Sequence, residues 1–258
     1  MERRATGWGL VIRLFACAFC AGASAVPVTA QGLAVTAEVS VARPEPGSGG
    51  RLRGASAYRR DDSEVVVWLT PLDAPAPPVP AHSAAAQTPE LVQRNKSFEP
   101  HILVVQVGSL IRFPNKDPFF HNIFSMYDGK RFDLGLYEAG TSRSVKFDRP
   151  GVSYLFCNIH AEMSAVVVVL DTPYFAMSDR AGHLTIPDVP EGRYQLHVWY
   201  ERSLPENLKA LSRVVTISGK TRSLGAIRVV DNPNFTLAHK NKYGEDYVPP
   251  ASEGYQHP

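Results

Sequence analysis

Apolar and polar residues alternate along much of the chain, at the period of a β-strand with one buried face. The alternation is clearest in residues 33–42 and 193–200, while residues 102–107 and 165–170 are continuously apolar and predict buried strands. Further strands are predicted at 64–70, 110–113, 144–147, 154–157, 183–186, 214–217 and 224–230. Turn sequences such as Arg149-Pro-Gly151 and Pro190-Glu-Gly192 separate them. The pattern predicts an all-β protein.

The density of predicted strands divides the chain. Between residues 90 and 171 the strands are as dense as in a small β-sandwich. The strands between 173 and 230 are too few for a sandwich of their own, and so are those at 33–42 and 64–70. Together these outer strands would make a small Ig-like sandwich. We therefore predict that the region 90–171 is inserted into a discontinuous outer domain. Two domains in plain succession are the alternative.

The remaining segments are predicted to be a leader, a linker and a tail. Residues 72–88 are rich in Pro and Ala and predict an extended connection. The predicted boundaries are 1–30 for a signal peptide, 31–72 for the N-terminal strands of the Ig-like domain, 73–89 for the linker, 90–171 for the inserted domain, 172–230 for the rest of the Ig-like domain, and 231–258 for the tail.

The N-terminal residues have the pattern of a secretory signal peptide. Basic residues precede a short apolar run at 14–21, and small-residue cleavage sites end at Ala25 and Ala30. A bilayer span needs about 20 apolar residues, so this run is too short, and no later run is long enough. We expect a periplasmic or secreted protein without a membrane span. A buried N-terminal helix is the alternative, and the route of export, general or twin-arginine, stays open.

The charge and the cysteine content exclude some classes of function. The formal net charge is +2 with no basic stripe, so no nucleic-acid partner is expected. Removal of residues 1–30 takes away three Arg, one Glu, Cys17 and Cys20, and leaves 24 basic and 24 acidic residues. Cys157 is then the single cysteine. In an oxidising compartment such a thiol must be buried, paired with another chain, or bound to a metal.

The segment after the strand at 154–157 contains three side chains of metal-ligand type. Cys157, His160 and Met163 stand three residues apart on one short loop between predicted strands. Thiolate and thioether are soft ligands that favour copper over zinc or magnesium. A further ligand is expected from a neighbouring strand, where His121 lies 36 residues upstream. Two histidines, one cysteine and a weak axial methionine form the ligand set of blue-copper electron-transfer sites.

Several enzyme classes are excluded by ligand counts and missing motifs. A dinuclear copper centre needs two cysteines in the loop, and multicopper oxidases need His-x-His pairs, which this sequence lacks. It also lacks Gly-x-Ser-x-Gly, His-Glu-x-x-His and a phosphate-binding glycine loop. We therefore expect a protein that is not an enzyme.

The region 90–171 resembles the cupredoxin family, which includes plastocyanin, azurin and amicyanin. The resemblance rests on Phe98-Glu-Pro100, Val107-Gly108, Phe113-Pro-Asn115, His121-Asn122, Phe147 to Gly151, and the Cys-x2-His-x2-Met loop, whose short spacing resembles that of amicyanin. It implies a Greek-key β-sandwich in which His121, Cys157, His160 and Met163 bind one mononuclear type 1 copper ion. It also implies a carrier of single electrons between redox partner proteins, such as a cytochrome or a dehydrogenase.

The outer segments resemble a carboxypeptidase regulatory-like, Ig-type domain, mainly through residues 179–194. The combination resembles bacterial exported plastocyanin-like or methylamine-utilisation proteins. Such outer modules serve mostly as scaffolds and fix no function. The competing hypothesis is a cell-envelope module that binds a glycan or a protein and keeps a vestigial or copper-storage site. Copper delivery is a third hypothesis, ranked last because the sequence has few methionines.

Residues around the predicted ligands have secondary roles in this reading. By the resemblance, Asn122 ties the His121 strand to the Cys157 loop through a side-chain hydrogen bond. Phe119 and Phe120 either form an apolar docking patch or fill the core. The remaining histidines are not expected to be ligands, and three of them are expected at the surface. Those three are His101, His183 and His197, while His82, His239 and His257 lie in the linker or tail.

Overall fold

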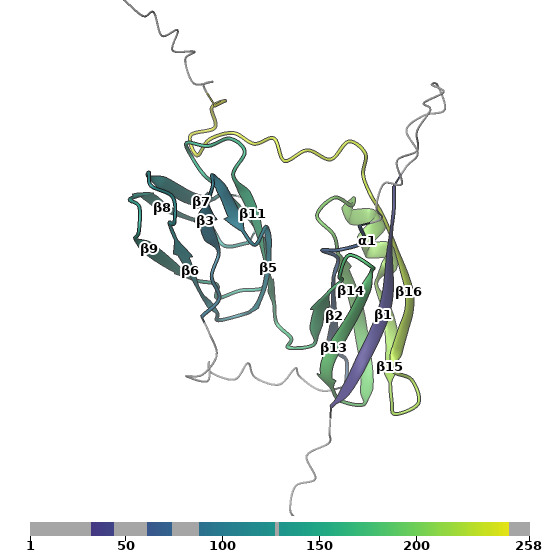
Figure 1. Cartoon of the computed structure of the whole chain (residues 1–258). Coiled ribbons are helices and arrows are strands. Elements are labelled where there is room, and N and C mark those ends of the chain that lie inside the picture. The colour runs from purple at the N-terminus through teal and green to yellow at the C-terminus, as the bar shows by residue number, and fades with distance from the viewer. Residues whose placement is uncertain (1–31, 44–60, 74–87, 127–128, 248–258) are drawn as a thin grey trace, which may run out of the picture. The chain divides into compact units, whose positions relative to one another are not determined.

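The computed structural model describes residues 32–43, 61–73, 88–126 and 129–247. The predicted signal peptide, most of the Pro/Ala linker and the end of the tail lie outside these residues. The described chain consists of strands with one short helix, and its strands form sandwiches (Figure 1). The predicted all-β fold is thereby confirmed.

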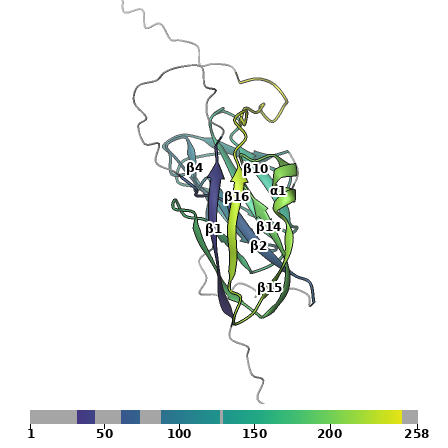
Figure 2. The same ribbon diagram turned by 90° about the vertical axis from the view of Figure 1, so that its right-hand side faces the viewer.

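The outer sandwich combines strands from both ends of the described chain. Strand β1 lies in the middle of one sheet, in the order β13-β1-β16, and pairs with β16 in parallel (Figure 2). The facing sheet has the order β12-β2-β14-β15. Strands β1 and β2 thus pair with strands that follow residue 172 in the sequence. The strands are β1 Leu33–Ala42, β2 Val66–Pro71, β12 Phe175–Met177, β13 His183–Val189, β14 Gly192–Trp199, β15 Arg213–Ile217 and β16 Ser223–Val230.

A tight turn at residues 179–182 directly precedes β13 and holds it against β1. The Gly182 amide donates to the carbonyl of Asp179 at 2.9 Å, which closes the turn predicted at 179–182. Gly182 has a φ of +84°, and a Cβ there would lie 2.0 Å from the carbonyl oxygen of Val39. Its own carbonyl accepts a hydrogen bond from the Val39 amide at 2.7 Å. Only glycine satisfies both the dihedral angle and the close approach.

We expect Gly182→Ala to destabilise the outer sandwich by about 2 kcal/mol or more, because the methyl group adds a backbone collision to the cost of a left-handed conformation. Gly225→Ala is the matched control, since Gly225 has a φ of +74° with nothing within 4 Å of a built Cβ. Urea unfolding of both variants measures the difference. Equal losses of stability would show that the contact with Val39 is unimportant.

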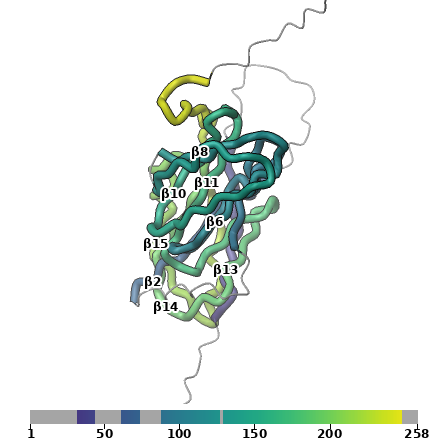
Figure 3. The backbone as a smooth tube through the Cα atoms, turned by 90° about the vertical axis from the view of Figure 1, so that its left-hand side faces the viewer, coloured from purple at the N-terminus to yellow at the C-terminus, as the bar shows by residue number. Residues whose placement is uncertain are grey.

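Strands β3 to β11 form a second sandwich, called the inserted sandwich below. Its main sheet has the order β5-β11-β10-β7-β8, and β6 pairs with β9 on the other side of the core (Figure 3). Isolated parallel bridges connect the β3 region to the β6 region, Glu90 with Arg112 and Gln93 with Asn115. The strands are β3 Val92–Arg94, β4 Ser97–Glu99, β5 Ile102–Gln106, β6 Leu110–Pro114, β7 His121–Ser125, β8 Phe132–Tyr137, β9 Ser142–Lys146, β10 Gly151–Phe156 and β11 Ser164–Leu170.

Strand β11 is buried on both faces, which explains its continuous apolar run. Ala165, Val167 and Val169 face the core of the inserted sandwich. Val166 and Val168 belong to another apolar cluster, which also contains Val66 of β2 and the partly buried Trp68 and Trp199. The strand therefore has no solvent-facing side chains that would produce alternation.

Two sequence interpretations need correction. Of the three histidines predicted at the surface, His101 and His197 are partly buried, whereas His183 is exposed. His101 is partly buried, with its Nε2 2.8 Å from the Glu201 carboxylate, and His197 stacks on Trp68 with ring centroids 4.9 Å apart. Helix α1, Pro205–Leu211, was not predicted; it is only seven residues long, and its Leu208 and Leu211 are just partly buried against the outer core. Within the described residues, no helix has the length and apolar character that a membrane crossing requires.

Candidate metal centre

Strands β7, β10 and β11 place the predicted ligands at one end of the inserted sandwich. His121 is the first residue of β7, and Cys157 directly follows β10, which pairs with β7 through Phe156 and Phe124. The loop from β10 to β11 is closed by its own backbone. The Cys157 amide donates to the Met163 carbonyl, and the Met163 amide donates to the His160 carbonyl, both at 3.2 Å. The hairpin thus holds the loop in a fixed shape.

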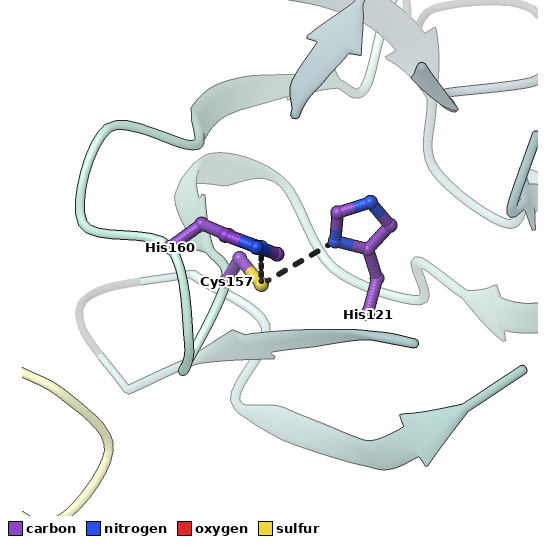
Figure 4. Close-up of side chains that lie close together, drawn as sticks. All are labelled: His121, Cys157 and His160. Atoms are coloured by element: carbon purple, nitrogen blue, oxygen red, sulfur yellow. Dashed lines mark hydrogen bonds between the residues drawn. The ribbon is translucent and has the colours of Figure 1, made fainter. Parts of the chain in front are cut away.

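The side chains of His121, Cys157 and His160 point toward one another (Figure 4). The Sγ atom of Cys157 lies 3.8 Å from Nδ1 of His121 and 3.5 Å from Nδ1 of His160. One ligand atom from each residue lies within 4.8 Å of the others. His121 and Cys157 are fully buried, whereas His160 is partly exposed. The three residues form a compact donor set with one edge toward solvent.

The spacing of these donors matches that required by a first-row metal ion. Bonds of about 2.3 Å to sulfur and 2.0–2.1 Å to nitrogen, at angles of about 110–120°, would separate sulfur from nitrogen by about 3.5–3.8 Å. The two separations in this chain fall in that range. One thiolate and two imidazoles are also the three strong ligands of a blue-copper site. The residues present therefore fit a copper ion in distance and in chemistry.

A buried carboxylate orients the first histidine. The Nε2 atom of His121 lies 2.7 Å from the carboxylate oxygen Oδ2 of Asp117, a side chain that is only 5% exposed. A proton on Nε2 donated to Asp117 leaves the lone pair of Nδ1 directed toward Cys157. Hydrogen bonds of this kind fix the tautomer of metal-binding histidines and their ring orientation. Sequence reasoning missed Asp117, although its spacing of four residues from His121 was visible.

The backbone around Asn95 and Lys96 holds the Asp117 carboxylate in turn. The Asn95 amide donates to Oδ1 at 2.6 Å and the Lys96 amide to Oδ2 at 2.9 Å. Burial alone would raise the pKa of Asp117, but these hydrogen bonds and that of His121 lower it below its usual value. Asp117 thus stays ionised while it is buried beside the centre.

Burial also shifts the pKa values of two predicted ligands, Cys157 and His160. It raises the pKa of the Cys157 thiol, despite hydrogen bonds from nearby backbone amides. Burial, together with the neighbouring His121, lowers the pKa of His160. At neutral pH the site therefore presents a thiol and a neutral imidazole. A cation that binds there must displace the thiol proton, because the thiolate is the ligand.

The predicted role of Asn122 agrees with the structure. Its Oδ1 accepts a hydrogen bond from the Asn158 amide at 3.3 Å, and its Nδ2 donates to Asp133 at 2.8 Å. The side chain thus links β7 to the residue after Cys157 and to β8. The expectation from the family resemblance is confirmed for this contact.

Met163 and the two phenylalanines complete the surroundings. Met163 is fully buried in the same apolar cluster as Cys157, and its role as an axial ligand remains a prediction. Phe119 and Phe120 are 36% and 55% exposed, so neither fills the core as one hypothesis held. The Phe119 ring lies 5.1 Å from His121 and 5.8 Å from His160 between centroids. Phe119 therefore lies at the rim of the site, next to both histidines.

Comparison with known proteins found cupredoxins among solved structures. A copper-containing nitrite reductase from Thermus scotoductus SA-01 is 22% identical over 36% of this chain and 25% of its own, with a TM-score of 0.32. A purple cupredoxin from Nitrosopumilus maritimus is 22% identical over 32% of this chain and 99% of its own, with a TM-score of 0.30. A methionine-to-alanine mutant of amicyanin, Cu(I), is 18% identical over 40% of this chain and 98% of its own, with a TM-score of 0.31.

The aligned part thus spans only a quarter of the nitrite reductase chain. No protein-family model matches this sequence, and no curated protein matches it. With scores this low, the function is inferred from the residues of the site.

Proposed function

We propose that this chain is an exported type 1 copper protein that carries single electrons between redox partner proteins and catalyses no reaction of its own. The observation that supports this most is the convergence of Cys157 Sγ with the Nδ1 atoms of His121 and His160 at separations suited to one ion. We include Met163 as the weak axial ligand, from its position on the same loop. When bound, copper supplies a one-electron couple between Cu(I) and Cu(II).

The chain's own residues would keep this centre rigid. Asp117 fixes the ring of His121, and Asn122 ties β7 to the Cys157 loop. The Cys157 and Met163 amides close that loop on itself. Ligands held in this way barely move when the charge of the centre changes, so electron transfer needs little reorganisation. Full burial of His121, Cys157 and Met163 keeps water away from the centre.

The rim supplies a route for electrons to a partner. His160 is partly exposed, the ring of Phe119 lies 5.8 Å from it between centroids, and Phe120 and Ile159, each next in sequence to Phe119 or His160, are exposed apolar side chains. We propose that these apolar side chains form the surface on which a redox protein, such as a cytochrome or a dehydrogenase, docks. Apolar contact of this kind suits a short-lived complex, because it needs no matched charges to form or dissociate.

The outer sandwich would act as the scaffold of this domain. We propose that the copper domain occupies residues 90–171 as an insertion, since β1 and β2 pair with strands that follow it. Export to the periplasm or the medium remains part of the proposal, on the strength of the leader sequence.

Visible absorption and electron paramagnetic resonance of the copper-loaded protein test the proposed function. We expect one equivalent of Cu(II) to give an intense blue band, because a thiolate bound to Cu(II) produces strong charge transfer, and ascorbate to bleach it reversibly. Zn(II) loading is the control and should give no colour. A weak band alone would contradict the proposal and favour the hypothesis of a binding module with a vestigial or storage site.

A further inference from the structure

The chain that follows β16 contacts the loop between β10 and β11, which contains Cys157 and Asn158. We call residues 236–247 the C-terminal strap, and it is the yellow segment beside the β10–β11 end of the inserted sandwich (Figures 1 and 3). The hydroxyl of Tyr247 lies 2.7 Å from the carbonyl oxygen of Cys157, to which it donates. The Lys242 amide donates to Oδ1 of Asn158 at 2.9 Å. The strap therefore binds the central cysteine and the residue after it.

A histidine of the strap braces this contact. The His239 ring stacks on Phe156 with centroids 3.9 Å apart and an interplanar angle of 22°. Its Nε2 lies 3.0 Å from the Tyr247 hydroxyl oxygen and donates to it in the tautomer that leaves the hydroxyl proton for the Cys157 carbonyl. Stacking on Phe156 and a hydrogen bond to Tyr247 both orient the strap toward Cys157. His239 was expected not to be a ligand, and here it supports a ligand's backbone instead.

An ion pair connects the strap to the opposite side of the loop. Nζ of Lys242 lies 2.8 Å from Oδ2 of Asp133, and Oδ1 of Asp133 accepts from Asn122. The lysine keeps the pKa of Asp133 below its usual value, although burial of the carboxyl opposes this. Asn122 in turn binds the Asn158 amide. The strap is thus part of a continuous hydrogen-bonded path that surrounds the Cys157–Asn158 peptide.

Both polar groups of the Cys157 backbone are consequently fixed. Its amide bonds to Met163 inside the loop, and its carbonyl accepts the Tyr247 hydroxyl from a segment 90 residues away. A hydroxyl that donates to this carbonyl directs the positive end of its dipole toward the cysteine. Such a dipole stabilises any added negative charge at the sulfur, most of all where water is excluded.

We infer that Tyr247 is a positioning residue of the proposed copper centre, which sets the orientation of the Cys157 peptide and favours the reduced form of the metal. This inference rests on the proposed function for its redox part. The reduced centre carries one more electron than the oxidised one. The positive end of the Tyr247 hydroxyl dipole therefore stabilises the reduced centre more than the oxidised centre. Removal of the hydroxyl shifts the equilibrium toward Cu(II).

Tyr247→Phe tests the inference, because it removes the hydroxyl and keeps the ring. The copper-loaded variant is equilibrated with a hexacyanoferrate mixture, and the ratio of reduced to oxidised protein is read from the blue band. We expect this ratio to fall about two- to fivefold. Only the difference in the strength of this hydrogen bond between the two oxidation states affects the ratio, and that difference is a fraction of the energy of one hydrogen bond. Tyr243→Phe is the matched control. Tyr243 is in the same strap but is 71% exposed, and Lys242 lies over its ring.

A measurement without copper separates this inference from the proposed function. The Cys157 side chain is fully buried, so its alkylation by iodoacetamide reports how often the loop opens. Tyr247→Phe should speed alkylation severalfold in the metal-free protein, while Tyr243→Phe should not. A wild-type protein without a blue band, but with alkylation that depends on Tyr247, would refute the electron-transfer function and retain the positioning role. A blue protein in which Tyr247→Phe changes neither ratio nor alkylation would refute the positioning role alone.

Discussion

Replacing Cys157 with serine should abolish the blue band of the copper-loaded protein. The band requires a thiolate bound to Cu(II), and serine has no sulfur to donate charge. Cys157 is also the shared neighbour of the two histidines, with its Sγ within 3.8 Å of both Nδ1 atoms. Any ion that remains would be held by the two imidazoles and the proposed axial Met163, without a thiolate. Visible absorption and electron paramagnetic resonance at one equivalent of copper give the result directly.

Met163→Leu is the control for this substitution. Leucine keeps the volume of the buried methionine and leaves the thiolate in place, so the colour should persist while the reduction potential moves. Circular dichroism establishes that both variants fold, since a buried serine hydroxyl without a partner costs about 1–3 kcal/mol. An unchanged copper spectrum in Cys157→Ser would show that the thiolate is not a ligand and would overturn the proposed centre.

The second large effect is expected at Asp117. Asp117→Asn should lower the affinity for copper about 10- to 100-fold, the usual cost of losing the group that orients a metal-binding histidine. Both oxygens of Asp117 accept hydrogen bonds, from Asn95, Lys96 and His121. Asparagine offers one oxygen and places an amino group against a backbone donor. The His121 ring therefore loses its fixed orientation, or the 95–96 backbone loses its partner.

Asp148→Asn serves as the matched control, because Asp148 is an exposed carboxylate of the same domain that pairs with Lys130. Competition with a chromophoric copper chelator measures both affinities. Equal affinities of the Asp117 variant and the wild-type protein would mean that His121 is oriented by packing alone. A loss of affinity in the Asp148 variant as well would point to a general electrostatic effect instead of a hydrogen bond.

Much of the fold was predictable because its strands carry strong local patterns. The alternation in residues 193–200 gives β14, whose buried side chains include Tyr194 and Leu196, and the Asp179–Gly182 turn is closed by its own backbone. Helix α1 was not predictable in this way, since none of its residues is buried. The domain boundaries remain predictions, although the pairing of β1 and β2 agrees with an insertion.

In the candidate site, too, residues with a local sequence pattern were predictable, and residues brought together only by the fold were not. Cys157, His160 and Met163 are close in sequence, so their common loop was visible, and His121 followed from the need for another ligand. Asp117 was missed because an acidic residue between a lysine and a proline has the composition of an ordinary loop. Tyr247 was missed because no periodicity connects it to Cys157, 90 residues earlier. Contacts of that kind depend on the path of the folded chain.

The parallel pairing of β1 with β16 has a consequence for the order of folding. The central strand of one outer sheet has a neighbour that leaves the ribosome nearly 190 residues later, as the pairing of Val39 with Ile227 illustrates. Contacts between such distant segments form slowly, whereas the inserted sandwich needs only strands between Val92 and Leu170. The inserted sandwich can therefore be complete while β1 still lacks β16 as its neighbour. Until β16 arrives, β1 presents an unpaired strand edge, the kind of feature that favours aggregation of incompletely folded chains.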